Sequence, residues 1–308
     1  MSVVAVTGAT GFIGRSLVRA LAARRPRTRL RLLVRRPDVP PLLRAHELVR
    51  GDLDDESALA RLVDGVDAVV HAAGAIGGNR AAAFDHVNVA GTRRLVDAVA
   101  DRAPASHFIL VSSLAARQPR LSWYAASKCA AEEVVHTRLE RFTVVRPPAV
   151  YGPEDPALAD FWRLLARGWL LRLGRPHARF SLLHVDDLVA ALRAALKRGG
   201  CREVVTLAGP EPAGGWNWSA LAAAAAAKRG RPVRVVPIPP WLLRTAGAGA
   251  LMLGRLGRRP ATLTPGKARE LLHADWVCDN LAVNRCLGVQ PVTRLEQALD
   301  TLPGWINR

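Results

Sequence analysis

Cysteine is scarce in this 308-residue chain, with four widely separated copies, and no Cys-x-x-Cys pair or His–Cys spacing suggests a metal site. The pattern predicts reduced thiols, as in a cytoplasm, and no bound metal. No apolar run reaches the length of about 18 residues that a membrane-spanning helix needs. The first residues, MSVVAVTGATGFIG, lack the basic start and long apolar stretch of a signal peptide. We therefore expect a cytoplasmic protein.

Lysine is also scarce, although the chain is strongly basic. There are 44 basic and 26 acidic residues, a net charge of +18, yet only four of the basic residues are lysines. This excess favours acidic partners such as anionic lipid head groups or phosphorylated substrates. The arginines form no long block and no arginine–aromatic motif, so we expect no nucleic-acid binding.

Short apolar runs alternate with helical stretches in the first half of the chain. This alternation predicts βαβ units and a parallel sheet with helices on both faces, an α/β fold of the doubly wound Rossmann type. The predicted strands are Val3–Val6, Leu30–Val34, Ala68–His71, Phe108–Val111 and Thr143–Val145. After about Tyr151 helical patterns dominate. We therefore expect a Rossmann domain over residues 1–150 and a smaller, mostly helical substrate-binding part over 151–308.

A glycine-rich loop follows the first predicted strand directly and precedes a helix. Glycine at these positions permits a tight turn, close approach of the backbone to a pyrophosphate and close helix–strand packing, while the helix N-terminus attracts phosphate. The sequence therefore predicts a dinucleotide site in this loop. Its predicted cofactor-binding residues are Gly8, Thr10, Gly11, Phe12, Ile13 and Gly14.

The end of the second predicted strand bears on the choice of cofactor. A site that prefers NAD usually carries an acidic residue there, which binds the ribose 2′-hydroxyl. Here the strand ends in Arg35 and Arg36, with no carboxylate before Asp38. Two guanidinium groups suit a 2′-phosphate, so the sequence favours NADP(H) over NAD(H), although arginine is common throughout the chain.

Tyr124 and Lys128 lie four residues apart and therefore on one face of a predicted helix. From two tyrosines and four lysines in 308 residues, this spacing is expected roughly 0.03 times by chance. A nearby ammonium stabilises a phenolate, so the pair is suited to proton transfer. Upstream, Ser112 and Ser113 end a strand at the sheet edge where substrates bind. Either hydroxyl can bond the reacting oxygen beside Tyr124, or simply cap the strand.

Taken together, these segments resemble the extended short-chain dehydrogenase/reductase family, which includes epimerases, dehydratases and 3β-hydroxysteroid dehydrogenases. The resemblance covers about the first 190 residues. The matching segments are TGATGFIG (7–14), GDL (51–53), HAAG (71–74), NVAGT (88–92), VSS (111–113), YAASK (124–128), RPPAVYGP (146–153) and HVDDLV (184–189).

The resemblance implies roles for further residues. Ser113 corresponds to the catalytic serine, with Ser112 as the alternative, and Tyr124 and Lys128 form the proton relay and contact the cofactor. Asn88 should brace the central helix, and residues 180–208 should return to the Rossmann domain. The segment between Ser113 and Tyr124 is shorter than in typical nucleotide-sugar epimerases, which leaves the serine–tyrosine geometry open. The implied cofactor contacts are Asp52, Leu53, Ala72, Ala73, Gly74, Pro147 and Val150.

The segment Trp241–Leu256 is apolar, and its Arg244 and Arg255 lie about 20° apart on a helical wheel. Arg258 and Arg259 follow it. Such a helix either contacts an anionic membrane peripherally on its inner face, or packs over the substrate cleft with its arginines exposed to solvent. The second half supplies few acidic or amide residues to bind sugar hydroxyls, which favours an apolar substrate.

These observations predict an NADPH-dependent oxidoreductase that reduces a ketone, or oxidises a secondary alcohol, on a hydrophobic molecule. The best specific hypothesis is a 3-keto sphingoid or ceramide lipid, since the chain loosely resembles bacterial reductases of that synthesis. The alternatives are a sterol 3β-dehydrogenase-like enzyme, a nucleotide-sugar 4-epimerase or dehydratase, and a non-catalytic NADP-binding scaffold. Reaction direction and oligomeric state stay open.

Overall fold

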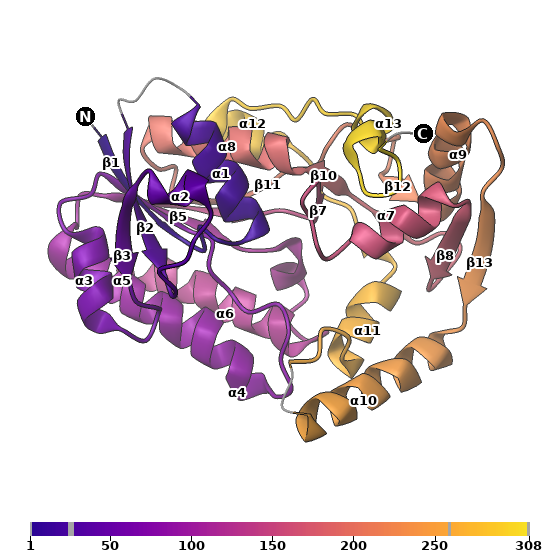
Figure 1. Cartoon of the computed structure of the whole chain (residues 1–308), viewed down its shortest axis with the longest axis horizontal. Helices are drawn as coiled ribbons and strands as arrows, with labels where there is room; N and C mark the ends of the chain where they lie inside the picture. Colours follow the sequence, from indigo (N-terminus) through magenta and orange to yellow (C-terminus); the bar gives the residue numbers. More distant parts are fainter. Residues whose placement is uncertain (1, 24–27, 258–259, 307–308) are drawn as a thin grey trace.

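A computed structural model describes residues 2–23, 28–257 and 260–306 of the chain (Figure 1). Its centre is a parallel sheet of seven strands in the order β11-β6-β5-β4-β1-β2-β3. The strands are β1 (Ser2–Thr7), β2 (Thr28–Val34), β3 (Glu47–Arg50), β4 (Ala68–His71), β5 (His107–Val111), β6 (Phe142–Arg146) and β11 (Glu203–Thr206). All five predicted strands are confirmed, as is the Rossmann-type architecture. The short edge strands β3 and β11 were not predicted.

Helices cover both faces of this sheet because side chains alternate along each strand. Val4 and Val6 of β1 enter the core under one set of helices, and Ala5 between them enters the core under the other. The first set is α1 (Phe12–Ala22), α2 (Pro41–Arg44), α8 (Val185–Arg198) and α12 (Leu281–Leu287). The second set is α3 (Glu56–Val63), α5 (Gly91–Arg102) and α6 (Trp123–Arg138).

Three short helical elements complete this half of the fold. Helix α4 (Ala81–Phe84) continues into a π-helical turn, η1 (Asp85–Ala90), which leads into α5. A 3₁₀ turn, η2 (Leu114–Arg117), joins the end of β5 to α6. Both irregular turns lie beside the carboxyl edge of the sheet, where the irregular backbone can carry functional groups.

The second half of the chain has a hydrophobic core of its own around Trp162, Trp216 and Trp305. Its helices are α7 (Ala159–Ala166), α9 (Trp218–Arg229), α10 (Pro240–Leu256), α11 (Pro265–Leu272) and α13 (Leu295–Ala298), with a 3₁₀ turn η3 (Leu299–Thr301). Short strands that the sequence did not predict join them: β7 (Ala149–Tyr151), β8 (Trp169–Leu173), β9 (Arg179–Phe180), β10 (Leu182–His184), β12 (Trp216–Asn217), β13 (Arg234–Ile238) and β14 (Asp275–Trp276).

After β7, β8, β9 and β10, which lie outside the large sheet, the chain returns to that sheet. β10 pairs with β7, α8 then packs on α1, and β11 adds a parallel edge strand beside β6. Among the helices of the second half, α11 packs directly on α6, whereas α9 packs on α7 and α13. None of the described helices is long and apolar enough to span a bilayer.

Candidate active site

The glycine-rich loop makes the tight turn that its spacing predicts. Gly8 has a φ of 73°, and the N–H of Gly11 donates to the Gly8 carbonyl at 2.9 Å. A Cβ on Gly14 would lie 2.1 Å from that same carbonyl oxygen. No side chain caps α1, whose N-cap is Gly11, and its first turn carries no acidic residue. The helix N-terminus thus offers N–H groups and a positive dipole end to a phosphate.

A hollow of about 440 Å³ opens at the ends of β2 and β3. It is lined by Arg35, Arg50, Gly51, Asp52, Asp55 and Arg61. The structure therefore brings Arg35 and Asp52 together but does not place Arg36 in the lining. Arg50 and Arg61 were missed by the sequence reasoning, although Arg50 directly precedes the GDL segment. Leu53 is buried against Gly91 rather than open to the hollow.

The loop Ala72–Gly74 lies between the glycine-rich loop and α6. A Cβ on Gly8 would come within 2.6 Å of the Ala72 carbonyl carbon, and one on Gly74 would lie 3.3 Å from the Lys128 Nζ. The Ala73 N–H donates to the Thr7 hydroxyl at 3.3 Å. The close spacing of these three segments leaves no room for side chains, as expected where a backbone cradles a flat or extended ligand.

Helix α6 presents Tyr124 and Lys128 from its first two turns. It begins there because Ser122 caps it, accepting the Ala125 N–H at 2.9 Å. Lys128 is buried and its Nζ donates to the Val111 carbonyl, at the end of β5, at 2.9 Å. Burial lowers the pKa of Lys128 to about 8, and nearby Glu132 opposes that shift.

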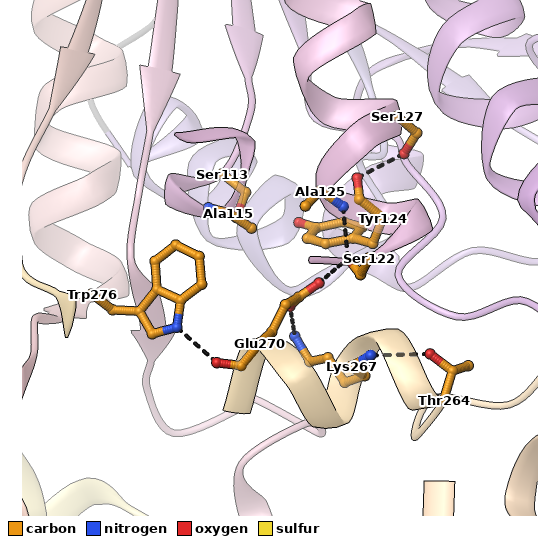
Figure 2. Close-up of polar contacts among 10 residues, drawn as sticks. All are labelled: Ser113, Ala115, Ser122, Tyr124, Ala125, Ser127, Thr264, Lys267, Glu270 and Trp276. Atoms are coloured by element: carbon orange, nitrogen blue, oxygen red, sulfur yellow. Dashed lines mark hydrogen bonds and ion pairs between the residues drawn. The ribbon is translucent and has the colours of Figure 1, made fainter. Parts of the chain in front are cut away.

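The Ser113 side chain lies close to that of Tyr124 (Figure 2). The short segment between them therefore still brings serine and tyrosine together, which the sequence left open. Burial, opposed by Ser113 and aided by Glu270, raises the pKa of Tyr124 to about 12. Ser112 instead donates to Glu132, which also pairs with Arg146. Ser113 is thus the serine available to a substrate.

Asn88, in the π-helical turn η1, forms hydrogen bonds with two other segments of the site. Its side-chain amide donates to the Ser127 hydroxyl at 2.9 Å and to the Ala75 carbonyl at 3.0 Å, and it accepts the Ala75 N–H at 2.7 Å. Asn88 therefore connects α6 to the loop after β4. On the other side of α6, the Pro147 carbonyl accepts the Leu114 N–H at 2.8 Å, beside Ser113, and Val150 lies in β7.

A second polar cluster, absent from the sequence predictions, borders Tyr124 from α11 (Figure 2). Glu270 is buried, accepts a hydrogen bond from Ser122 and pairs with Lys267 at 2.7 Å. The Lys267 ammonium lies 5.7 Å from the centre of the Tyr124 ring. No sequence motif marks these residues, because α11 is nearly 150 positions away from Tyr124 along the chain.

This geometry fits a nicotinamide dinucleotide: uncapped N–H groups for the pyrophosphate, a charged hollow for the adenosine end, and a Ser113–Tyr124–Lys128 group at the other end. In the part of the chain that the structure describes, no cluster of three or more His, Cys, Asp or Glu side chains could hold a metal. The assembled residues can bind a dinucleotide and move a proton.

Comparison with known proteins shows which family the chain belongs to. The model of the NAD-dependent epimerase/dehydratase family matches residues 4–208. Ceramide reductase of Caulobacter vibrioides is 42% identical over 276 residues, which cover 89% of this chain and 85% of that protein. Sterol demethylase protein B of Methylococcus capsulatus is 33% identical over 228 residues, which cover 65% of this chain and 68% of that protein. The structure of UDP-glucuronic acid 4-epimerase from Bacillus cereus in complex with NAD superposes with a TM-score of 0.72 at 19% identity, covering 99% of this chain and 98% of that one.

The chain therefore belongs to the NAD-dependent epimerase/dehydratase family of extended short-chain dehydrogenases/reductases. The resemblance indicated by the motifs is confirmed. Members of this family are NAD(P)-dependent oxidoreductases and epimerases. The 19% identity to the epimerase shows a shared fold alone.

Proposed function

We propose that this protein is an NADPH-dependent reductase that converts a ketone of a hydrophobic, lipid-like substrate to a secondary alcohol. The observation that carries the proposal is that Ser113 lies beside Tyr124, while Lys128 lies one turn further along α6 with its ammonium near Gly74, in a loop that suits a dinucleotide. The bound nicotinamide supplies the hydride.

Tyr124 is the proton donor in this reaction. Its raised pKa keeps the phenol protonated at neutral pH, which suits a group that must deliver a proton to the carbonyl oxygen. Ser113 donates a hydrogen bond to the same oxygen and so helps to hold it against Tyr124. The Lys128 ammonium stabilises the phenolate that forms when the proton leaves.

The proposed substrate is a 3-keto sphingoid or ceramide lipid. Support comes from the 42% identity to a protein named ceramide reductase. The chain also carries no Asp or Glu between residues 212 and 269, so much of the second half offers no carboxylate to bind sugar hydroxyls. A sterol is the second candidate, favoured by the 33% identity to sterol demethylase protein B.

The preference for NADPH rests on the hollow at the ends of β2 and β3. Three guanidinium groups, those of Arg35, Arg50 and Arg61, border it, and β2 ends without a carboxylate. Guanidinium groups bind phosphate oxygens through paired hydrogen bonds, so this cluster suits a 2′-phosphate.

NADPH oxidation should be measured against a panel of long-chain 3-keto lipids, keto-steroids and nucleotide sugars. We expect turnover with the keto-lipids, and a Tyr124→Phe variant should lose about a hundredfold or more of it because the proton donor is gone. NADPH binding by this variant should stay nearly intact. Undiminished turnover would refute the role of Tyr124. A tightly retained NAD that recycles on nucleotide sugars would instead support the epimerase class.

The cofactor preference has a matched control in the chain itself. Replacing Arg35 and Arg50 with glutamine should weaken NADPH binding roughly tenfold for each guanidinium that binds the 2′-phosphate, and NADH binding little. Arg36→Gln should have no such selective effect, because Arg36 does not line the hollow. Dissociation constants for both cofactors check this. Equal losses for NADPH and NADH would remove the argument for NADPH.

A further inference from the structure

Helix α10 exposes large apolar side chains to solvent. Trp241 is 65% exposed, Met252 65%, Leu253 70% and Leu256 73%, and Leu242 is exposed as well. We call these five residues the α10 apolar face. Contiguous exposed apolar surface on a folded chain marks an interaction site more often than single exposed leucines do.

This exposure follows from how α10 packs on the rest of the molecule. Its buried positions are two glycines, Gly247 and Gly254, and a Cβ on Gly247 would lie 3.0 Å from the Thr264 backbone. The helix therefore contacts its support, including α11, closely at these glycines, with Leu243, Ala250 and Leu251 half-buried beside them. At about 100° per residue, the α10 apolar face lies on the opposite side, centred more than about 120° away. A helix that only covered a core would turn its large residues inward.

The same end of the molecule carries further exposed apolar residues. β13 leads directly into α10 and pairs with β8 (Figure 1). Trp169, Leu171 and Val235 of these two strands are exposed, and the Arg234 guanidinium lies 5.0 Å from the centre of the Trp169 ring. Tryptophan with arginine beside it is the composition typical of protein surface at the level of lipid head groups.

The segment of the chain that contains α10 carries charges of one sign. Residues 212–269 contain ten arginines and lysines and no Asp or Glu. On α10 itself, Arg244 and Arg255 flank the apolar face on one side, near the edge of the packed stripe. Arg258 and Arg259, which follow the helix, lie outside the described residues. An apolar face flanked by arginines complements an anionic surface that has an apolar interior.

We propose that the α10 apolar face inserts into the interfacial layer of an anionic lipid bilayer, with Arg244 and its neighbouring cations on the head groups. A second copy of this chain fits less well, because a two-fold interface would bring Arg244 and Arg255 of one copy close to the same arginines of the other. The proposal commits to a peripheral contact, in agreement with the lack of a spanning helix among the described residues.

This contact would lie next to the active site. The Asn79 side chain donates to the Gly254 carbonyl of α10 at 2.9 Å and accepts the Ala261 N–H at 2.9 Å. Asn79 belongs to the loop that follows Ala72–Gly74, and α10 also packs on α11, which carries Glu270. A bilayer bound at α10 would therefore lie on the side of the molecule that carries α11, the helix that borders Tyr124, and we infer that a lipid substrate enters from this side. This last step rests on the proposed function; the membrane contact itself does not.

The test is sedimentation with vesicles of phosphatidylcholine alone and of phosphatidylcholine mixed with phosphatidylglycerol. We expect the protein to bind the anionic vesicles, and more weakly at high salt. A Trp241→Ser, Leu253→Ser, Leu256→Ser variant should lose about tenfold or more of that binding because it loses the inserted area. Arg244→Gln should lower binding to the anionic vesicles by about fivefold and leave neutral vesicles unaffected.

The matched control replaces Leu281 and Val292, which are 76% and 72% exposed but lie outside the apolar face, with serine. It should bind vesicles as the parent protein does, and all variants should keep the parent melting temperature. The proposal is overturned if the parent protein ignores anionic vesicles, or if the triple variant binds them equally well. It is also overturned if the triple substitution turns a dimer into a monomer without altering vesicle binding. No substrate or cofactor enters this assay, so its failure is separable from failure of the proposed reductase activity.

Discussion

Two of the four lysines in the chain belong to the candidate active site. The Lys128 Nζ lies at the end of β5 and the Lys267 Nζ lies over the Tyr124 ring, although arginine supplies almost every other cation. A compact ammonium fits between the Val111 carbonyl and Gly74, where a planar guanidinium would need more space. The rarity that marked Lys128 in the sequence therefore has a steric reason.

The lowered pKa of Lys128 predicts a pH dependence of the reduction. Below its pKa of about 8 the ammonium is charged and stabilises the phenolate of Tyr124, and above it this charge is lost. The phenol itself stays protonated until about 12. The kcat/KM for ketone reduction should therefore fall as the pH rises through about 8, measured from initial rates of NADPH oxidation.

A Lys128→Arg variant is the control for this assignment. Its guanidinium keeps its charge throughout the range, so whatever activity it retains should show no decline near pH 8. If the alkaline decline persists at the same pH in this variant, another group is responsible for it.

At the scale of the element, close packing of the loop onto the start of α1 governs the phosphate site. Gly14→Ala would place a Cβ 2.1 Å from the Gly8 carbonyl oxygen, so loop and helix must separate. We expect cofactor binding to weaken by about tenfold or more, along with a lower melting temperature. Titration with NADPH checks the first effect and thermal unfolding the second.

Gly249→Ala offers a matched control, because a Cβ there meets nothing within 4 Å. It lies inside α10, where alanine is the better helix former by about 1 kcal/mol, so stability should stay or rise. Should Gly14→Ala bind NADPH as tightly as Gly249→Ala does, close packing at Gly14 does not govern the site.

At the scale of the whole molecule, Asp187 joins the C-terminal segment to the Rossmann half. It is buried in the first turn of α8 and accepts the N–H groups of Val292 and Thr293 at 3.1 and 3.0 Å. Asp187→Ala leaves both donors without this acceptor, which should lower the free energy of unfolding by about 1–3 kcal/mol. Urea denaturation measures the loss.

Asp186→Ala provides the comparison for that substitution. Asp186 lies in the same first turn, where its charge has a similar interaction with the helix dipole, but its side chain is 78% exposed. The Asp186→Ala substitution should lower the free energy of unfolding by less than about 1 kcal/mol. Equal losses in the two variants would mean that the bonds to residues 292 and 293 contribute little.

Much of the fold was predictable from the sequence, and the failures share a cause. Strands such as Phe108–Val111 have an apolar pattern of their own, whereas the strands of two or three residues are too short to show one and form by pairing with segments elsewhere in the chain. The same holds in the site. The spacing of Tyr124 and Lys128 is visible within one helix, but Glu270 comes beside Tyr124 only because α11 packs on α6.

The sequence by itself determined the glycine turn, the Tyr124–Lys128 pair and the βαβ order, because each depends on residues a few positions apart. Tertiary structure decided which serine faces Tyr124, which arginines border the hollow at β2 and β3, and which side of α10 meets solvent. Those outcomes depend on contacts between segments far apart in the chain. Arg35 and Arg36 are an example, because they are neighbours in the sequence and yet Arg35 lines the hollow while Arg36 does not.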